Sequence, residues 1–290
     1  MCNMRLGART RISLVFAVAA LALTSVRPAC AQAQTAPIGF TVQITPSTGI
    51  VEPVRGLPFY LLRKSFSNIQ QEAEASLPMP DMEKFIDSQQ VSKELRAWMH
   101  KHHSVTLSGD EFAKSLTAEE ILNIPEFWQA YDQMNIGEAK FGFPVPKYKE
   151  SDRVRDPAKY QREVAEYHAR VLKYINENPD SKEGLNAELE SIDPSPQWND
   201  KVAARSSAIH RMSLDWAQSR YLVAQTQTDV NGRAEFIGVP AGNYWISSLN
   251  IDGQVGDIRE KWDVPIAVHA GVAMQMVLSN YNGIPAKNAS

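Results

Sequence analysis

The stretch from Gln225 to Asn250, QTQTDVNGRAEFIGVPAGNYWISSLN, constrains the fold more than any other part of the chain. Two turn signals, Asn231-Gly232 and Pro240-Ala241-Gly242, divide it into three runs with strand-like composition. Asparagine and glycine both tolerate a positive φ angle, so Asn231-Gly232 between such runs predicts a β-hairpin, which Asp229 can cap with its carboxylate. The proline fixes φ and the glycine permits conformations that other residues resist, which predicts a second turn. The stretch therefore predicts three successive strands, and it indicates an architecture rather than a reaction.

The pattern T-D-x-N-G-x-x-x-F-x-x-V-P-A-G-x-Y, from Thr228 to Tyr244, resembles the carboxypeptidase regulatory-like domain. The resemblance implies an antiparallel β-sandwich of the prealbumin-like (transthyretin-like) type, with Phe236 and Tyr244 as core aromatic residues. That superfamily contains both enzymes and non-enzymes, so the resemblance specifies a fold and leaves the activity open. The residues to which it assigns a structural role at the turns are Asp229, Asn231, Gly232, Pro240, Gly242 and Tyr244.

Residues 1–33 have the pattern of a secretory signal peptide. Three arginines at positions 5, 9 and 11 precede an apolar run, Ile12 to Leu23, that is too short to span a bilayer comfortably. Ala31-Gln32-Ala33 then provides a small-x-small cleavage site. The pattern predicts a secreted or periplasmic protein whose mature chain has no transmembrane segment.

Cys2 and Cys30 are the two cysteines of the chain, and cleavage after Ala33 would remove both. The residues before Cys30 make a poor lipidation motif, although lipidation of this cysteine remains an alternative. Without residues 1–33 the chain keeps 26 basic and 33 acidic residues, a net charge of −7. A chain that is acidic and lacks a basic run is a poor candidate for binding nucleic acid.

The strands that would complete a sandwich lie far apart in the sequence. Ile38 to Thr45 and Leu57 to Lys64 read as the first two strands, whereas Trp262 to His269 and Val272 to Ser279 read as the last two. The intervening residues are helical by pattern, and the first two strands alone cannot bury a sheet face. The chain is therefore expected to be an α+β protein, a β-sandwich interrupted by an all-α insertion, rather than two tandem domains. The expected segments are a signal peptide (1–33), the first sandwich strands (34–65), the helical insertion (66–220), the remaining strands (221–284) and a polar tail (285–290).

Helix signals within the insertion are clear at several points. Pro80 to His103 has the apolar spacing of one long helix, and Thr117 to Glu120 forms a capping box. Pro125 and Asp156-Pro157 each begin a further helix. A last long helix follows Pro196 and runs to about Arg220. Ile251 to Glu260, by contrast, reads as a loop.

The histidines supply the metal hypothesis. His100, His102 and His103 cluster at the end of a predicted helix, where they also suit the helix macrodipole as cations. His168 lies on another predicted helix. Together these four residues are the ligands of an alternative in which the chain is a metal-dependent hydrolase or oxygenase, and that alternative requires them to converge with a carboxylate.

An aromatic and proline-rich connection between helices supplies the binding hypothesis. Gly137 to Lys149, GEAKFGFPVPKYK, has an extended composition. It could present an exposed strip to a peptide or polysaccharide, or its rings could pack the helices together. The candidate binding residues are Phe141, Phe143 and Tyr148.

The enzymes that share the resemblance each carry a motif that this chain lacks. The H-x-H iron-ligand pair of intradiol dioxygenases is missing, because His269 is the one histidine after Tyr244. Tyr281-Asn282-Gly283-Ile284 does not match the terminal Y-R-G-S motif of hydroxyisourate hydrolases. The chain also lacks the H-x-x-E of metallocarboxypeptidases, a G-x-S-x-G and a phosphate-binding loop.

These observations favour a non-catalytic accessory or interaction protein of the periplasm or the extracellular space. Its expected partner is a protein or a cell-surface polysaccharide. No catalytic residues, cofactor or nucleic-acid partner are expected.

Overall fold

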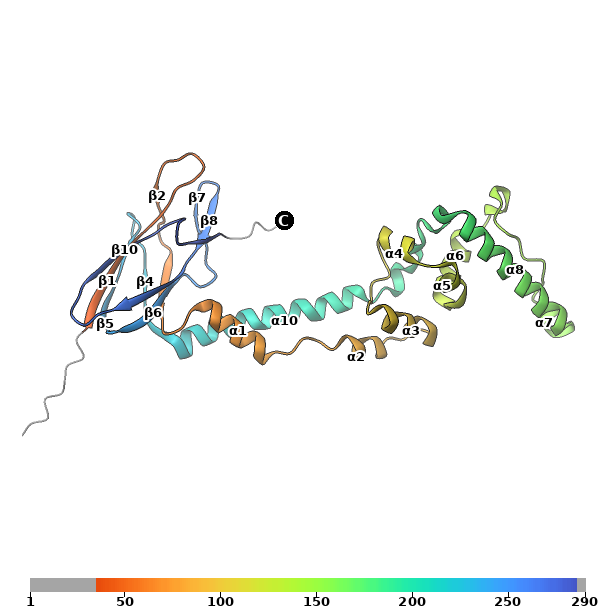
Figure 1. Cartoon of the computed structure of the whole chain (residues 1–290), viewed down its shortest axis with the longest axis horizontal. Helices are drawn as coiled ribbons and strands as arrows, with labels where there is room; N and C mark the ends of the chain where they lie inside the picture. The colour runs from red at the N-terminus through yellow and green to blue at the C-terminus, as the bar shows by residue number, and fades with distance from the viewer. Residues whose placement is uncertain (1–34, 286–290) are drawn as a thin grey trace, which may run out of the picture.

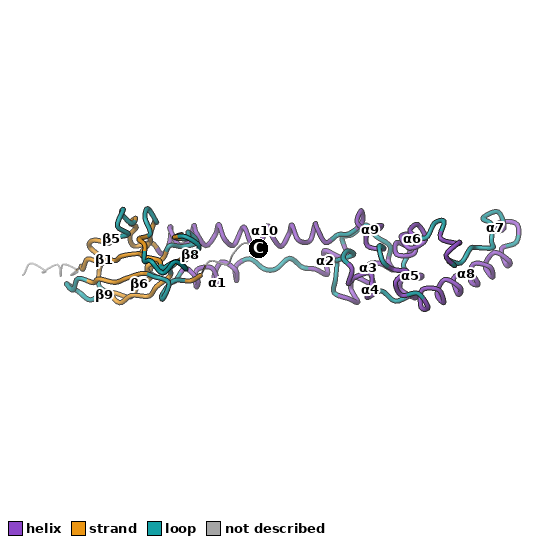
Figure 2. The backbone as a smooth tube through the Cα atoms, turned by 90° about the horizontal axis from the view of Figure 1, so that it is seen from above, coloured by secondary structure: helices purple, strands orange, loops and turns teal. Residues whose placement is uncertain are grey.

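The computed structural model describes residues 35–285, apart from the side chains of Asp110 and Phe141. The predicted signal peptide, both cysteines and the end of the predicted polar tail lie outside the described residues. The described chain has the shape of a dumbbell: a β-sandwich stands at one end, a cluster of helices at the other, and a long helix joins them (Figures 1 and 2).

The sandwich consists of two principal sheets. The first places β1 (Thr35–Ile44) between β5 (Arg233–Pro240) and β10 (Met274–Leu278), with short β2 (Glu52–Pro53) at the end of β1. The second has the order β4 (Leu222–Gln227), β3 (Pro58–Leu62), β6 (Gly242–Ser247) and β9 (Asp263–Val268). A small third sheet contains β7 (Gly253–Val255), β8 (Ile258–Lys261) and β11 (Ile284–Pro285).

The core of the sandwich lies between the two principal sheets. The Phe40 ring meets Phe59 edge-on with ring centroids 5.2 Å apart, and Phe59 lies 5.9 Å from the fully buried Trp262. Phe236 and Tyr244 are also buried, as the turn motif implied. Inward residues come from both sheets because side chains alternate along each strand.

The α+β class predicted from the sequence is confirmed, but three details of the β-structure were predicted wrongly. β1 and β10 pair in parallel, so the sandwich is not wholly antiparallel. Residues 251–260, predicted to be a loop, contain β7 and most of β8. The third concerns the strands on either side of Asn231-Gly232.

Those strands do not form a paired hairpin. The Asp229 carboxylate accepts hydrogen bonds from the backbone N–H groups of Asn231 and Arg233, both at 2.8 Å, and the Asp229 N–H donates to the Arg233 carbonyl. Beyond this first rung, β4 pairs with β3 while β5 pairs with β1, in the other sheet. The turn chemistry was therefore read correctly, but its strands belong to different sheets.

All the helices of the described chain lie in sequence between β3 and β4, which are hydrogen-bonded neighbours. We call α1, residues 77–81 and α10 the stalk, and residues 82–194 the head. The stalk helices are α1 (Phe66–Ser76) and α10 (Ser195–Trp216), and α10 continues into a π-helical turn (Ala217–Tyr221). The head contains α2 (Met82–Asp87), α3 (Lys93–His102), α4 (Asp110–Ser115), α5 (Ala118–Asn123), α6 (Pro125–Met134), α7 (Asp152–Arg155), α8 (Pro157–Glu177), α9 (Leu185–Leu189) and 3-10 turns at Glu138–Phe141, Pro179–Lys182 and Glu190–Ile192.

The long helix predicted from Pro80 to His103 is in fact two helices, α2 and α3. Ser88 turns its hydroxyl back onto the Phe85 carbonyl at 2.7 Å, as serine does when it competes with helical hydrogen bonds. Ser92 then caps α3 by accepting from the Leu95 N–H, and its own N–H and hydroxyl donate to Glu126. The apolar spacing continued through the break, so periodicity alone could not show it.

The junction between stalk and sandwich has its own small core. Leu62, Phe66, Ile69, Ala217 and Leu249 are buried together there. Asp263, at the start of β9, accepts hydrogen bonds from the N–H groups of Phe66 and Ser67, at 3.0 and 3.1 Å. A sheet residue therefore caps the first turn of α1, where free N–H groups and the helix dipole favour a carboxylate. Burial raises the pKa of Asp263, and these donors oppose that rise.

Further polar contacts hold the base of the stalk. Glu72 of α1 pairs with Lys64 and accepts a hydrogen bond from the Tyr221 hydroxyl at 2.9 Å. Farther along, the Arg205 guanidinium of α10 donates to the Leu77 carbonyl at 2.8 Å and so fixes the start of the extended residues 77–81. These contacts hold α1 and residues 77–81 to α10 and the turn that follows it at two points along the stalk.

Gly232 is the turn residue for which the structure demands glycine, and it supplies a first prediction. Its φ angle is +74°, and a Cβ atom would overlap the Val42 carbonyl oxygen and lie 3.0 Å from the Cβ of Pro53. We expect Gly232→Ala to lower the free energy of unfolding in urea by about 3 kcal/mol or more, because backbone strain and steric overlap add.

Gly238→Ala is the matched control. Gly238 has a similar φ of +71°, but a Cβ atom there meets no other atom within 4 Å, so only strain of about 1–2 kcal/mol is expected. Equal losses in the two variants would contradict the close approach of Gly232 to β1.

Candidate functional site

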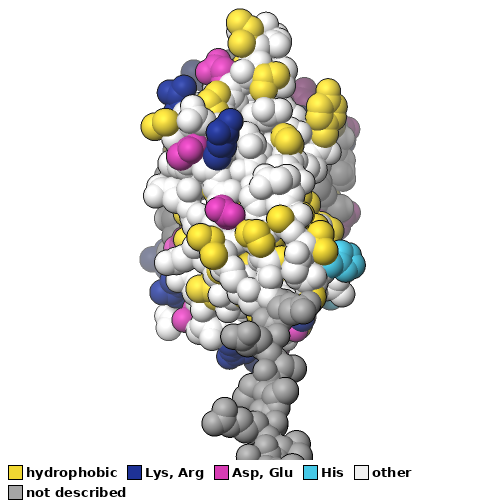
Figure 3. Space-filling view, turned by 90° about the vertical axis from the view of Figure 1, so that its left-hand side faces the viewer, with side chains coloured by type: hydrophobic (Ala, Val, Ile, Leu, Met, Phe, Trp, Pro, Cys, Tyr) yellow, Lys and Arg dark blue, Asp and Glu magenta, His cyan; other side chains and the backbone are white. Residues whose placement is uncertain are grey.

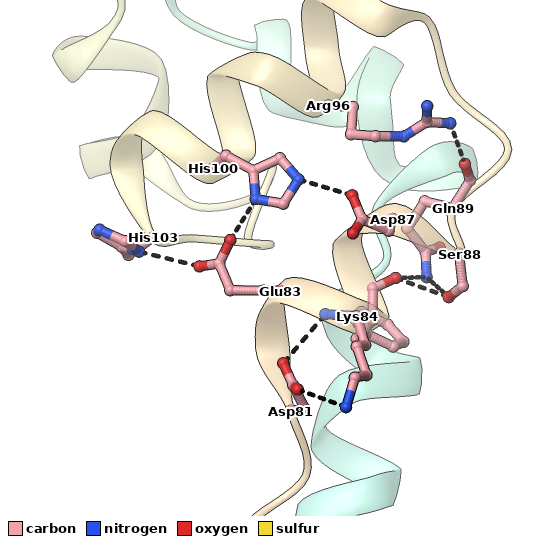
Figure 4. Close-up of polar contacts among 10 residues, drawn as sticks. Asp81, Glu83, Lys84, Asp87, Ser88, Gln89, Arg96, His100 and His103 are labelled. Atoms are coloured by element: carbon pink, nitrogen blue, oxygen red, sulfur yellow. Dashed lines mark hydrogen bonds and ion pairs between the residues drawn. The ribbon is translucent and has the colours of Figure 1, made fainter.

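Two of the predicted histidines meet a shared carboxylate between α2 and α3 (Figure 4). Glu83 of α2 bonds the Nδ1 atom of His100 through one oxygen and the Nδ1 atom of His103, at 3.2 Å, through the other. Asp87, one turn after Glu83 on α2, lies 2.9 Å from the Nε2 atom of His100. We call these four residues the Glu83–His100 cluster.

The cluster favours a charged His100. Both ring nitrogens of this residue face carboxylates, and only the imidazolium form can donate from both. The hydrogen bond to Glu83 and then that to Asp87 raise the pKa of His100 above its ordinary value, and the bond to His100 lowers the pKa of Glu83. The arrangement joins α2 to α3 by charge-assisted hydrogen bonds and leaves neither nitrogen of His100 free as a base or a ligand.

His102 points to a different carboxylate. Its Nε2 atom lies 3.1 Å from Glu120 of α5, and its ring stacks on Trp98 with centroids 4.5 Å apart. Glu120 also closes the predicted capping box with Thr117, which is confirmed, and pairs with Lys101. Burial alone would raise the pKa of Glu120, but the hydrogen bonds from Thr117, Lys101 and His102 outweigh it and lower that pKa to about 2.

His168 lies apart from the other three, on α8, where its ring meets Trp128 of α6 edge-on at 5.3 Å. Among residues 35–285 the structure contains no group of three or more histidine, cysteine or acidic side chains arranged to hold a metal ion. The structure does not bring His100, His102, His103 and His168 together: they take part in three separate contacts, with Glu83, with Glu120 and with Trp128.

The two described side chains among the candidate binding residues, Phe143 and Tyr148, do not form an exposed aromatic strip. Phe143 is only 8 % exposed and packs against Tyr131 and Tyr174. Tyr148 is half-buried and meets Tyr160 and Tyr167 edge-on, and burial raises the pKa of its hydroxyl. The side chain of Phe141 is outside the described part of the structure. The rings that are described pack the helices of the head together.

Sequence reasoning missed the residues that organise the histidines, namely Glu83, Asp87 and Glu120. A signal was available for the first two, because an acidic pair four residues apart lies on one face of a helix. Which histidines this face would meet depends on how α2 folds back on α3, and the sequence spacing does not contain that information.

Comparisons with known proteins add no family. No protein-family model matches this chain, and no curated protein matches it significantly. Two solved structures are similar, the pilus backbone RrgB of Streptococcus pneumoniae (11% identity, TM-score 0.22, covering 85% of this chain and 41% of that one) and the full-length major pilin RrgB (11% identity, TM-score 0.20, 84% and 30%). The match spans less than half of each pilin chain, and TM-scores this low carry no argument about fold or function.

Nothing in the described helices has the character of a membrane anchor: none between residues 35 and 285 is both long and apolar enough to cross a bilayer. At the free end of the sandwich, basic and acidic side chains are interspersed and neither sign forms a continuous patch (Figure 3).

The Glu83–His100 cluster gives a prediction about protonation. The stability that charged His100 contributes is fully present below its ordinary pKa of 6.5 and is lost as pH rises through its raised pKa. The stability that ionised Glu83 contributes is present above its ordinary pKa of 4.5 and is lost as pH falls through its lowered pKa. Both contributions are therefore present between pH 4.5 and 6.5. In an NMR titration, the His100 ring should titrate above 6.5, and Glu83→Gln should move its pKa down.

Glu94→Gln is the control, because Glu94 lies on α3 without touching His100 and pairs with Lys93 instead. A His100 pKa that does not respond to Glu83→Gln, or that moves equally in the control, would contradict the cluster.

Proposed function

We propose that this chain is a non-catalytic interaction protein of the periplasm or the extracellular space, in which the β-sandwich carries the head on the stalk and the head binds a partner protein. The pattern from Thr228 to Tyr244 supports placing the sandwich among carboxypeptidase regulatory-like domains of the prealbumin-like type. The predicted signal peptide supports the location. In this proposal, residues 66–220 form one insertion within the sandwich.

The observation that carries the proposal is the construction of α10. Its 22 residues span about 33 Å at the rise of an α-helix, and Ser213 is its one buried residue. Trp198 at one end packs into the head against Phe85, while Leu214 and Trp216 at the other end pack into the junction core. A helix whose two ends pack into two separate cores acts as a spacer. A spacer of this length holds the head away from the sandwich, which suits a head that binds a partner.

The arrangement of polar residues also supports a non-catalytic role. The head histidines are engaged by Glu83, Asp87 and Glu120 rather than set around a substrate-sized space. Net negative charge argues against nucleic acid as the partner. A protein or a cell-surface polysaccharide is a suitable partner for a chain in the periplasm or the extracellular space. Because the stalk holds the head away from the sandwich, we assign the protein partner to the head.

Site-specific photo-crosslinking of the full chain tests this proposal. A benzophenone amino acid replaces Val154, which is 87% exposed near the tip of the head, and separately replaces Ile237, 81% exposed on β5 of the sandwich. Both variants are expressed with the native signal sequence. We expect discrete adducts to a protein from position 154 and none from position 237.

Adducts from position 237 alone, or identical adducts from both positions, would contradict binding by the head. A second head position, the 67% exposed Ile136, guards against a poorly oriented probe at 154. The absence of a protein adduct at both head positions would also overturn the proposal.

A further inference from the structure

A shallow hollow of about 370 Å³ lies on the outer face of the second sheet, beside its edge strand β4. Its walls come from two neighbouring strands, with Pro58 and Tyr60 on β3 and residues 225–227 on β4. Ligand hollows that recognise small molecules start at about this size and combine a ring or apolar floor with a few polar groups.

Strand register places these side chains on one face. Tyr60 lies directly opposite Gln225, and Pro58 directly opposite Gln227, in the antiparallel pairing of β3 and β4. Directly opposed residues share a face of the sheet, so Gln225 lies beside Tyr60 and Gln227 beside Pro58 on that face. Trp245, paired with Leu62 on β6, continues the same face toward the junction.

The tyrosine ring is held in place while its polar end is free. Tyr60 is half-buried because it packs against the junction core. In the described part of the structure neither its hydroxyl nor the Gln225 amide has a hydrogen-bond partner. Gln227 donates from Nε2 to the Gly56 carbonyl at 2.7 Å, which fixes its amide and leaves its Oε1 atom available.

The chemistry of the hollow is hydrogen-bonding and uncharged. Its lining is Pro58, Tyr60, Gln225, Thr226 and Gln227, none of which is charged at neutral pH. The Gln225 amide offers donors and an acceptor, and the Gln227 amide offers its Oε1 acceptor. The Tyr60 hydroxyl can donate and accept, and its ring offers an apolar face with a polar tip. An anionic ligand would find no cation among these lining residues, whereas a neutral ligand such as a sugar can place its hydroxyl groups against the amides and its ring carbons against the tyrosine ring.

We propose that this hollow is a binding subsite for one sugar unit of an uncharged polysaccharide. Because β4 is an edge strand, the hollow is open on one side, and a longer chain can continue past it. The inference extends the proposed function by giving the sandwich a glycan ligand, while the head keeps its protein partner. It places the sandwich on a surface polymer and the head at a distance from it.

A second polar hollow, which the first sheet lines together with Thr226 and Gln227 of β4, provides an internal comparison. Its first-sheet residues include Arg233, Glu235 and Gln275, so it carries charges of both signs and no exposed aromatic ring. Gln275 is exposed there, as Gln225 is in the hollow on the second sheet. Gln275→Ala therefore removes the same amide from a site not expected to bind a neutral sugar.

Calorimetric titration of the full chain with defined oligosaccharides tests the inference. The neutral probes are cellohexaose, maltoheptaose and chitohexaose, and the charged comparison is hexagalacturonate. We expect at least one neutral probe to bind with a Kd below about 1 mM, and hexagalacturonate to bind at least about tenfold more weakly. Gln225→Ala should weaken the neutral probe by about tenfold, and Gln275→Ala should leave its Kd unchanged.

Both glutamines are exposed, so thermal unfolding of either variant should match that of the parent chain. Tyr60→Phe keeps the ring and its packing, and we expect it to weaken binding through loss of the hydroxyl alone. Failure of all three neutral probes, equal binding of hexagalacturonate, or an unchanged Kd in Gln225→Ala would overturn the inference. The crosslinks from position 154 do not depend on this hollow, so they report on the head separately.

Discussion

Adjacent, antiparallel strands β3 and β4 impose the constraint on which the rest of the molecule depends. The helical residues between β3 and β4 must therefore start and end next to each other, at one end of the second sheet. The structure meets this requirement with α1 and α10, which pack together where they leave the sheet and bury Phe66, Ile69 and Ala217 with Leu62 of β3. Capping of α1 by Asp263 then ties the orientation of the stalk to β9, two strands away from β3 in the same sheet.

The packing at this junction determines how firmly the head is held relative to the sandwich. Most helical stability in proteins comes from tertiary packing, so the helical state of α10 depends on its packed ends and on α1 and residues 77–81 beside it. Arg205 contributes by binding the carbonyl at which α1 gives way to the extended residues. The π-helical turn at Ala217–Tyr221 lets Arg220 stack on Trp216 while Tyr221 reaches Glu72, and so accommodates the change from helix to β4.

Local chemistry was readable from the sequence and long-range pairing was not. The capping box at Thr117 and Glu120, the helix start at Pro125 and the turn at Asn231-Gly232 each rest on groups within a few residues of one another, and each is present. The predicted hairpin beyond that turn does not form because β4 pairs with β3 and β5 pairs with β1, in two different sheets. The histidines of α3 are divided between carboxylates of two other helices, Glu83 of α2 and Glu120 of α5, and the sequence does not show which helices pack against α3. Tyr60 and Gln225, 165 positions apart in the numbering, meet only through strand register.

The most direct test of the account is the distance between the head and the sandwich in solution. Spin labels at Val154 and Ile237, in a chain whose two native cysteines are replaced by serine, can be measured by double electron–electron resonance. A rigid stalk predicts one narrow distance distribution that agrees with the extended arrangement of Figure 1. A broad distribution, or one at short distances from a head folded back on the sandwich, would contradict the claim that the stalk holds the two ends apart.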